Sequence, residues 1–312
     1  MAARITLGGY QGDNSVHTRA VRVFCDVLRR EAGDSAEVAF EQNIVAQGRK
    51  AADLLTMTES GELTGCYFSS SYLADRVPEL GLFDQHFVVP DRKHAYAVLD
   101  GELGNWLARE VEKQTGFYVL GYWDNGLRNI SSGRGPLRAP EDCKGLRIRT
   151  LANEDHQQVF RALGFDPVKI DVRDLPAAVR SGEVDAQENP LTNIYNFELH
   201  RIHKHITLTR HLLGVAIVLF NKEQVKSWPE EARRAVDKAL VEATRAQRDM
   251  AEKDDTICAE AMKADGAELI ELTATERARF REVTRDQVSA MRERFSPELI
   301  AMFEADLAAA QE

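Results

Sequence analysis

The sequence has no long hydrophobic run. None of its stretches approaches the roughly 20 consecutive apolar residues that a membrane-spanning helix needs, although 44% of its 312 residues are hydrophobic. Met1-Ala2-Ala3-Arg4 leads almost directly into strand-like Ile5-Thr6-Leu7. That opening lacks the basic, apolar and small-residue regions of a secretory signal. The sequence therefore predicts neither a membrane-spanning helix nor a leader within these residues.

Positive charge is also scarce. Forty Lys and Arg residues stand against 50 Asp and Glu residues, which gives a net charge of -10. Nucleic-acid binding requires basic patches, so this balance argues against a nucleic-acid partner. The length and the 29% charged composition are typical of an ordinary globular protein with one large or two medium domains.

Motifs of catalysis and nucleotide binding are missing. The chain contains no G-x-x-x-x-G-K-[ST], G-x-G-x-x-G, G-x-S-x-G or H-E-x-x-H, the usual signatures of several enzyme classes. Glu183, Asp185 and Glu188 could be paired carboxylates, but no partner acid or base is identifiable. An enzyme acting on an organic acid therefore remains only an alternative reading.

The four cysteines form no pattern. Cys25, Cys66, Cys143 and Cys258 are far apart, with no C-x-x-C pair, so they indicate neither a disulfide framework nor a zinc site. Cys25 and Cys66 have apolar neighbours and are expected to be buried. Whether any of the four pair in an oxidising compartment stays open.

Four histidines crowd into one short segment. The spacing of His200, His203 and His205 could suggest a metal site, but it matches no zinc pattern, and no cysteine lies close by. We therefore expect no metal, and we expect these three histidines to lie on the surface at a helix end. His211 is considered separately below.

The most informative stretch runs from Gly145 to Tyr195. Leu146, Ile148 and Thr150 alternate with two arginines, the period of a strand. Two segments with helical spacing follow, the first ending at Gly164 and the second at Gly182. They indicate two helices that separate three strands. Arg149 and Asn189 each stand at a strand exit, which is where open α/β sheets bind ligands.

This stretch resembles a known family. GLRIR at 145–149 and SGEVDAQENP at 181–190 are similar to the substrate-binding proteins of TRAP transporters, the DctP-like family, and the resemblance covers nearly the whole chain. It implies an α/β, two-domain periplasmic-binding-protein fold with doubly wound sheets, a hinge and a long helix that braces both domains. It also implies a periplasmic monomer whose leader has been removed, which needs no cofactor and delivers a small organic acid to membrane permease subunits.

The expected domains follow from two crossings of the chain. Domain I comprises 1–125 and about 214–254, and domain II comprises 126–213 and about 255–312, with the ligand cleft between them. The first crossing follows a strand at 118–123 and the turn signal Asp124-Asn125-Gly126, and the second is an apolar strand at 214–220. Between Pro229 and Gly266, about 36 residues without glycine or proline predict a helix of roughly 54 Å.

Other expected elements have simpler signals. Period-two and helical patterns predict strands at 4–8, 37–42, 63–68 and 268–271, and helices that start near Val16 and span 49–58, 93–114, 273–294 and 297–311.

The resemblance also suggests site residues. The arginine that pairs with the ligand carboxylate falls on Arg149 and the asparagine beside it on Asn189, while a second arginine falls on Arg128. His211 aligns with a position that faces the cleft, and Val172 stands where an aromatic residue often packs on the ligand. A planar guanidinium suits this role because it meets both carboxylate oxygens at once.

Further candidates are polar or aromatic groups near strand ends. Ser69 and Tyr72 lie in a loop that is either a pocket wall or a capped helix start, and the other candidates are Asn153, Asn193, Trp123 and Tyr10. The many hydroxyl and amide groups favour a hydroxylated acid, such as a sugar acid. A stand-alone ligand sensor of the same fold is the other alternative.

Overall fold

The computed structural model describes residues 2–310, which form two compact units. The first unit contains residues 2–70, 106–124 and 215–253, and the second contains 71–105, 125–214 and 254–310. Both crossings lie close to the expected positions, near Asn125 and Gly214. Residues 71–105 differ from the expectation, because they group with the second unit rather than the first.

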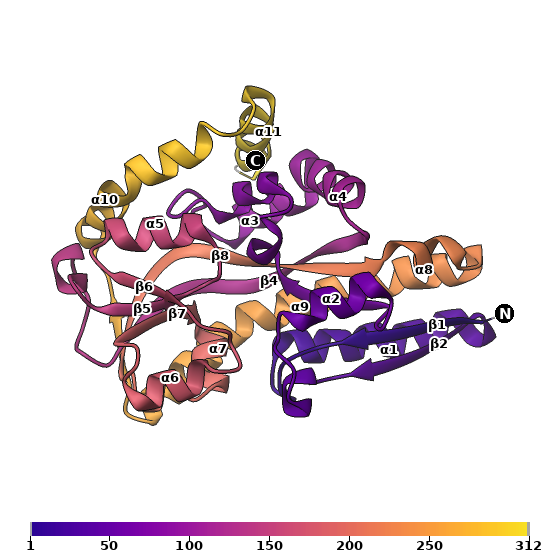
Figure 1. Ribbon diagram of the computed structural model, residues 1–312, viewed down its shortest axis with the longest axis horizontal. Helices are drawn as coiled ribbons and strands as arrows, with labels where there is room; N and C mark the ends of the chain where they lie inside the picture. Colours follow the sequence, from indigo (N-terminus) through magenta and orange to yellow (C-terminus); the bar gives the residue numbers. More distant parts are fainter. Residues whose placement is uncertain (1, 311–312) are drawn as a thin grey trace. The chain divides into compact units, whose positions relative to one another are not determined.

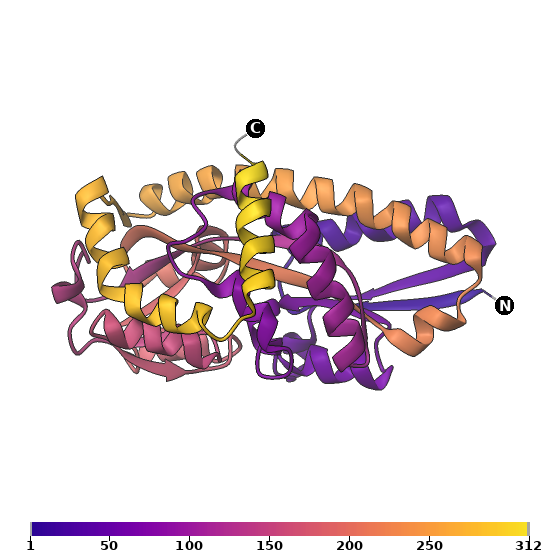
Figure 2. The same cartoon turned by 90° about the horizontal axis from the view of Figure 1, so that it is seen from above.

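Packing within the second unit explains this grouping. The helix α3 (Arg92–Asp100) packs against α11 (Pro297–Ala309), and Figure 2 shows α11 beside it. The 3-10 helix at Pro78–Asp84 contacts α5 (Glu154–Ala162). These are long-range contacts that no local pattern in the sequence reveals.

The elements of the described chain alternate between strands and helices (Figure 1). The remaining helices are α1 (Val16–Ala32), α2 (Asp53–Ser60), α4 (Glu102–Gln114), α6 (Leu175–Ser181), α7 (Leu191–Asn196), α8 (Lys222–Ser227), α9 (Glu230–Ala264) and α10 (Ala274–Arg292). The strands are β1 (Ala3–Gly8), β2 (Ala36–Glu41), β3 (Gly65–Ser69), β4 (Phe117–Ser132), β5 (Arg147–Thr150), β6 (Asp166–Lys169), β7 (Ala186–Pro190), β8 (His205–Asn221) and β9 (Glu268–Glu271).

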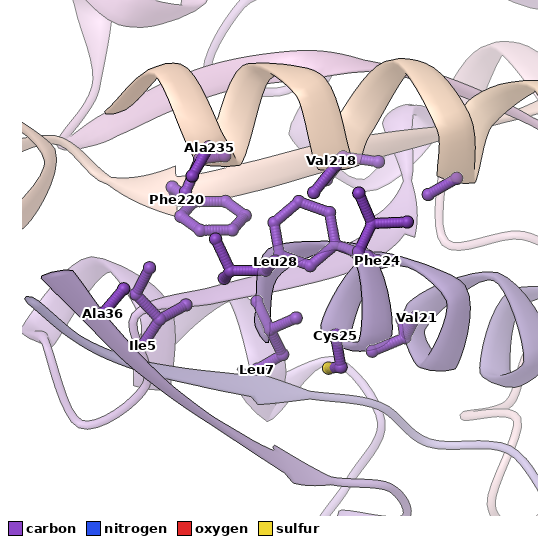
Figure 3. Packing of buried hydrophobic residues seen from close by; sticks show 14 of the residues in the cluster. Ile5, Leu7, Val21, Phe24, Cys25, Leu28, Ala36, Val218, Phe220 and Ala235 are labelled. Carbon is purple, nitrogen blue, oxygen red and sulfur yellow. The ribbon is translucent and has the colours of Figure 1, made fainter. Parts of the chain in front are cut away.

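The first unit is built on a mostly parallel sheet. β1 pairs in parallel with β2 and β3, and β3 pairs antiparallel with β8. Ser15 caps α1 by accepting hydrogen bonds from the backbone N–H groups of His17 and Thr18. The buried face of α1 then packs on the sheet, with Phe24, Leu28 and Phe220 among the side chains drawn in Figure 3. This apolar cluster is the core of the unit.

The second unit contains the strand–helix alternation that the sequence indicated. β5 lies between β6 and β7 and pairs with both in parallel, and β7 pairs antiparallel with β4. In Figure 1, α5 and α6 lie on opposite sides of these strands, as a doubly wound arrangement requires. Gly182 ends α6 at a φ of 72°, a left-handed conformation that glycine adopts without steric cost.

Two expected element boundaries are wrong. β4 does not stop at Asp124-Asn125-Gly126 but continues to Ser132, because β7 supplies a partner for Arg128–Ser132. Gly126 permits this with a φ of 86°, and a Cβ there would lie 2.5 Å from the Cβ of Pro190. The helix expected at 93–114 is broken at Gly101 into α3 and α4.

The long helix and the burial of Cys25 and Cys66 agree with the expectations. α9 has 35 residues, and its residues up to Lys253 belong to the first unit and the following ones to the second. All four cysteines are buried and free, and burial raises the pKa of Cys66 to about 12. Within residues 2–310, no helix has both the length and the apolar character to cross a bilayer.

Candidate ligand-binding site

Arg149 is a buried arginine without an acidic partner. It lies on β5, which is covered on both edges by β6 and β7, and only 1% of the residue is exposed. Its Nε donates a 2.8 Å hydrogen bond to the carbonyl oxygen of Ile170. Within the described part of the chain, no Asp or Glu forms an ion pair with it. Its terminal guanidinium nitrogens are therefore available to an anion.

Asn189 lies on the neighbouring strand and shares a face with Arg149. The register places Arg149 opposite Gln187, and side chains two residues apart on a strand point the same way. The Asn189 amide nitrogen donates to Gln187 at 2.6 Å, and Gln187 in turn donates to Ser131 at 2.7 Å. Asn193, at the start of α7, donates to the Asn189 carbonyl oxygen at 3.4 Å. These bonds fix the orientation of Asn189.

Arg128 differs from Arg149 because it already has a carboxylate partner. Its guanidinium donates to both carboxylate oxygens of Glu188, with Nη2 and Oε1 2.8 Å apart, and both side chains are at most 1% exposed. Burial alone would raise the pKa of Glu188, but the charge of Arg128 and hydrogen bonds from His211 and Arg128 hold that pKa well below its usual value. The sequence pattern suggested Glu188 only as one of three possible paired carboxylates, and it did not reveal Arg128 as its partner.

His211 belongs to the same buried network. Its Nε2 lies 3.2 Å from a carboxylate oxygen of Glu188, and its Nδ1 lies 2.7 Å from the Thr209 hydroxyl. The ring stacks on His86 with a centroid distance of 5.5 Å, and His86 meets His156 edge-on at 4.7 Å. Burial lowers the pKa of both His86 and His211. His211 therefore orients Glu188, and Glu188 orients Arg128.

Asn153 is used within the fold of the second unit. Its carbonyl oxygen caps α5 by accepting from the backbone N–H of Asp155 at 2.9 Å, and its amide donates to the Ser71 carbonyl oxygen at 3.2 Å. The Ser71 hydroxyl donates to Asp84 at 2.7 Å. Tyr72 lies in the 3-10 helix Ser70–Leu73, so the loop begins a helical turn.

Four more candidates lie elsewhere. Ser69 is the last, buried residue of β3, and Val172 lies partly buried in the turn before α6. Trp123 is 2% exposed, and its indole N–H donates to the Thr244 hydroxyl at 3.0 Å. Tyr10 packs on Tyr67 at a centroid distance of 5.6 Å. Trp123 is thus part of the core of the first unit.

The expected surface position of the histidine cluster is wrong for two of its members. His200 and His203 are 1% and 2% exposed, because each finds a partner far along the chain. His200 lies 3.0 Å from a carboxylate oxygen of Asp265, and burial lowers the pKa of His203 to about 4. In residues 2–310, no group of three or more His, Cys, Asp or Glu side chains is arranged to hold a metal.

A family comparison identifies the type of protein. Residues 7–294 match the family described as bacterial extracellular solute-binding protein, family 7. The chain belongs to this family. Its members bind solutes, so the chain is a solute-binding protein rather than an enzyme.

Individual relatives agree with this assignment. An uncharacterized protein of Haemophilus influenzae is 35% identical over 199 residues, and the match spans 64% of this chain but only 60% of that relative. The 2,3-diketo-L-gulonate-binding periplasmic protein YiaO of Escherichia coli is 28% identical over 93% of this chain and 88% of its own length.

A solved structure supports both the fold and the expected transporter class. A TRAP periplasmic solute-binding protein from Sulfurospirillum deleyianum with bound succinate has a TM-score of 0.90 and 27% identity over 98% of this chain and 99% of that protein. The resemblance to TRAP substrate-binding proteins is thereby confirmed, as is the α/β periplasmic-binding fold.

Proposed function

We propose that this protein captures a small organic acid in the periplasm and delivers it to the membrane permease subunits of a TRAP-type transporter. Arg149 clamps the carboxylate of that acid, with Asn189 beside it. A hydroxylated or sugar acid is the preferred class.

One observation carries the proposal, and it is the contrast between two buried arginines. A buried cation is costly unless it is paired and hydrogen-bonded. Arg128 meets this requirement with Glu188, whereas Arg149 is equally buried and has no ion-pair partner within residues 2–310. A ligand carboxylate would supply that partner, and the planar guanidinium can donate two parallel hydrogen bonds to it.

The network around Arg128 supports the site indirectly. Asn189 accepts a 3.5 Å hydrogen bond from Arg128 and a second one from Asn193. Asn189 is thus held in one orientation before a ligand arrives, which lowers the entropy lost on binding. His211 acts through Glu188 in the same network and positions the site.

Two relatives suggest which acids to test. The relative from Escherichia coli is named for 2,3-diketo-L-gulonate, a hydroxylated acid, and the solved structure carries the plain dicarboxylate succinate. The side chains of Asn153 and Ser71 are already bonded within the protein, so they add less to a hydroxyl preference than the sequence suggested.

A thermal-shift screen tests the proposal. The panel contains galactonate, erythronate, 2,3-diketo-L-gulonate, succinate, a keto acid and an aromatic acid, with glycerol and a neutral sugar as uncharged controls. A ligand at 100 times its Kd stabilises the folded state by about 2.7 kcal/mol. We expect a hydroxylated acid to give the largest shift and the uncharged controls to give none. If no carboxylate stabilises the protein, or if the neutral sugar does so equally, the proposal is contradicted.

Delivery needs a separate test. Proteoliposomes that contain the permease subunits should take up the acid identified by the screen only when this protein is added outside. Uptake at the same rate without the protein would contradict the transport role while leaving the binding role intact.

A further inference from the structure

The second unit contains a cavity of about 450 Å³ that includes none of the site residues above. One wall is the turn at residues 87–90, another is Arg210 on β8, and the third is the first two turns of α10, with Arg277 and Arg281. Volumes of about 300–1,000 Å³ are typical of small-molecule sites. This cavity is therefore large enough for a small ligand.

The cavity has more positive charge than its neighbours neutralise. Arg210 and Arg277 share a single carboxylate, that of Glu271. Arg281 is exposed, and its guanidinium forms no hydrogen bond or ion pair with any residue from 2 to 310. Three guanidinium groups thus face one acid, in a chain whose net charge is -10. An anion would balance this local excess.

Arg277 is held in place before any ligand binds. Its guanidinium donates to the backbone carbonyl oxygens of Thr209 and Leu208 on β8. Burial and the nearby charge of Arg210 lower the pKa of Arg277, which indicates that the two cations repel each other. An anion between them would relieve that repulsion.

Two walls have an unusual backbone conformation. Phe87 and Arg210 have φ angles of 61° and 44°, and they are two of the three non-glycine residues with positive φ in the described chain. The N–H of Phe87 donates to the carbonyl oxygen of His211 at 2.7 Å, which couples the two segments. Such conformations are strained for residues with a side chain, and they cluster at ligand-binding sites.

The rest of the cavity lining is apolar, and its small side chains leave room for a ligand. Phe87, Val88 and Val89 are partly buried, and Ala274 and Ala278 present only methyl groups from α10. A fully hydrated inorganic anion gains nothing from such a surface, whereas an apolar body buries area on it.

From these features we infer a second binding site, for a small organic anion with an apolar body. Its charged head lies among Arg210, Arg277 and Arg281, and its body lies over Phe87, Val88 and Val89. The site is separate from Arg149, so its ligand need not be the transported acid.

Hexanoate is a suitable probe, with inorganic phosphate and hexylammonium as comparisons. The primary measurement follows backbone amide shifts of the 15N-labelled wild-type protein. We expect hexanoate to shift the amides of Phe87, Val88 and Val89 in a saturable way, and we expect hexylammonium to leave them unchanged. Phosphate should bind at least about tenfold more weakly than hexanoate, because it lacks the apolar body.

Variants then test the charge. Arg281→Glu should weaken hexanoate binding at least about tenfold, which corresponds to about 1.4 kcal/mol, without lowering stability, since Arg281 has no partner to lose. Arg285→Ala is the matched control, one turn further along α10 and paired with Glu282, and it should bind hexanoate like the parent. Arg149→Ala should also retain this binding while it loses the transported acid, which separates the two sites.

Several results would overturn the inference. These are an absence of saturable shifts at residues 87–89, equal binding of phosphate and hexanoate, or an equal loss of affinity in the Arg281 and Arg285 variants.

Discussion

Removing either partner of the buried ion pair Arg128–Glu188 should lower the free energy of unfolding, and the two losses should depend differently on pH. In Glu188→Ala, Arg128 keeps its charge in a site that is 1% exposed, because arginine does not lose its proton in proteins. Breaking a buried ion pair from one side costs about 3–5 kcal/mol of unfolding free energy. We expect a loss of that size at every pH between 5 and 8.

Arg128→Ala should behave differently with pH. Glu188 then remains buried beside His211 alone, and without the arginine its pKa moves above the ordinary value because burial disfavours the charge. A carboxyl group whose folded-state pKa is raised gains stability as pH falls toward that pKa. The cost of Arg128→Ala should therefore be large at pH 8 and smaller at pH 5, while the cost of Glu188→Ala stays constant.

Urea titrations of the parent and both variants at pH 5 and pH 8 measure these differences. Arg134→Ala is the control, since Arg134 pairs with Asp185 on the same segment as Glu188 but is itself 64% exposed, and Asp185 keeps a second partner in Arg147. Its loss of stability should therefore be smaller than that of either single variant. The double variant Arg128→Met/Glu188→Leu should be closer to the parent than either single variant. Two single variants within about 1 kcal/mol of the parent, or with the same pH dependence, would refute the reasoning.

Three further predictions concern the cysteines, His203 and the absence of a metal site among the described residues. The native protein should resist iodoacetamide at pH 8 at all four cysteines, because all four are buried, and burial raises the pKa of Cys25 to about 11 and of Cys66 to about 12. Mass spectrometry that finds labelled native protein would contradict this. His203 has a pKa lowered by burial to about 4, so the unfolded state binds more protons between pH 6.5 and 4, and stability should fall as pH falls through that window. The free energy of unfolding of His203→Gln should depend less on pH between 6.5 and 4 than that of the parent. Equal dependence in the two proteins would argue against a lowered pKa of His203. Chelator treatment should leave the melting temperature unchanged, and a clear decrease would reveal a metal site.

Local patterns predicted the part of the chain that is organised locally. The strands around Arg149 and Asn189 and the helices between them were expected from alternation, helical spacing and the two stop glycines, and β5, α5, β6, α6 and β7 lie there. These signals act over a few residues, which is why a single sequence reveals them.

Long-range partners explain what the sequence did not show. Asp124-Asn125-Gly126 has the composition of a turn, yet β4 continues through it and pairs with β7 at Arg128–Ser132. α4 begins after Gly101 because Asp306, about two hundred residues away, accepts from the N–H groups of Glu102 and Leu103.

The same limit applies to the site. His200 was expected on the surface because Asp265, its partner, is 65 residues away in sequence. Arg128 and Glu188 are 60 residues apart, so nothing local marks them as a pair. The sequence could identify both Arg149 and Arg128 as candidates. Their expected roles differ because Arg128 is paired with Glu188, whereas Arg149 has no ion-pair partner within residues 2–310.

The most direct test of the carboxylate clamp is titration calorimetry on Arg149→Ala with galactonate or succinate, whichever gives the larger thermal shift. Removing one side of a buried charged contact costs about 2–5 kcal/mol, so affinity should fall by roughly thirty-fold to several thousand-fold. Arg149→Lys should recover only part of the loss, because an ammonium group cannot present two parallel donors.

Arg147→Ala is the matched control on the same strand. Its side chain is 46% exposed and pairs with Asp185, so it should bind like the parent, and Arg128→Ala should lose less affinity than Arg149→Ala. The account predicts a folded Arg149→Ala protein with at least about thirty-fold weaker binding. A folded Arg149→Ala protein that binds the acid as tightly as the parent would contradict it.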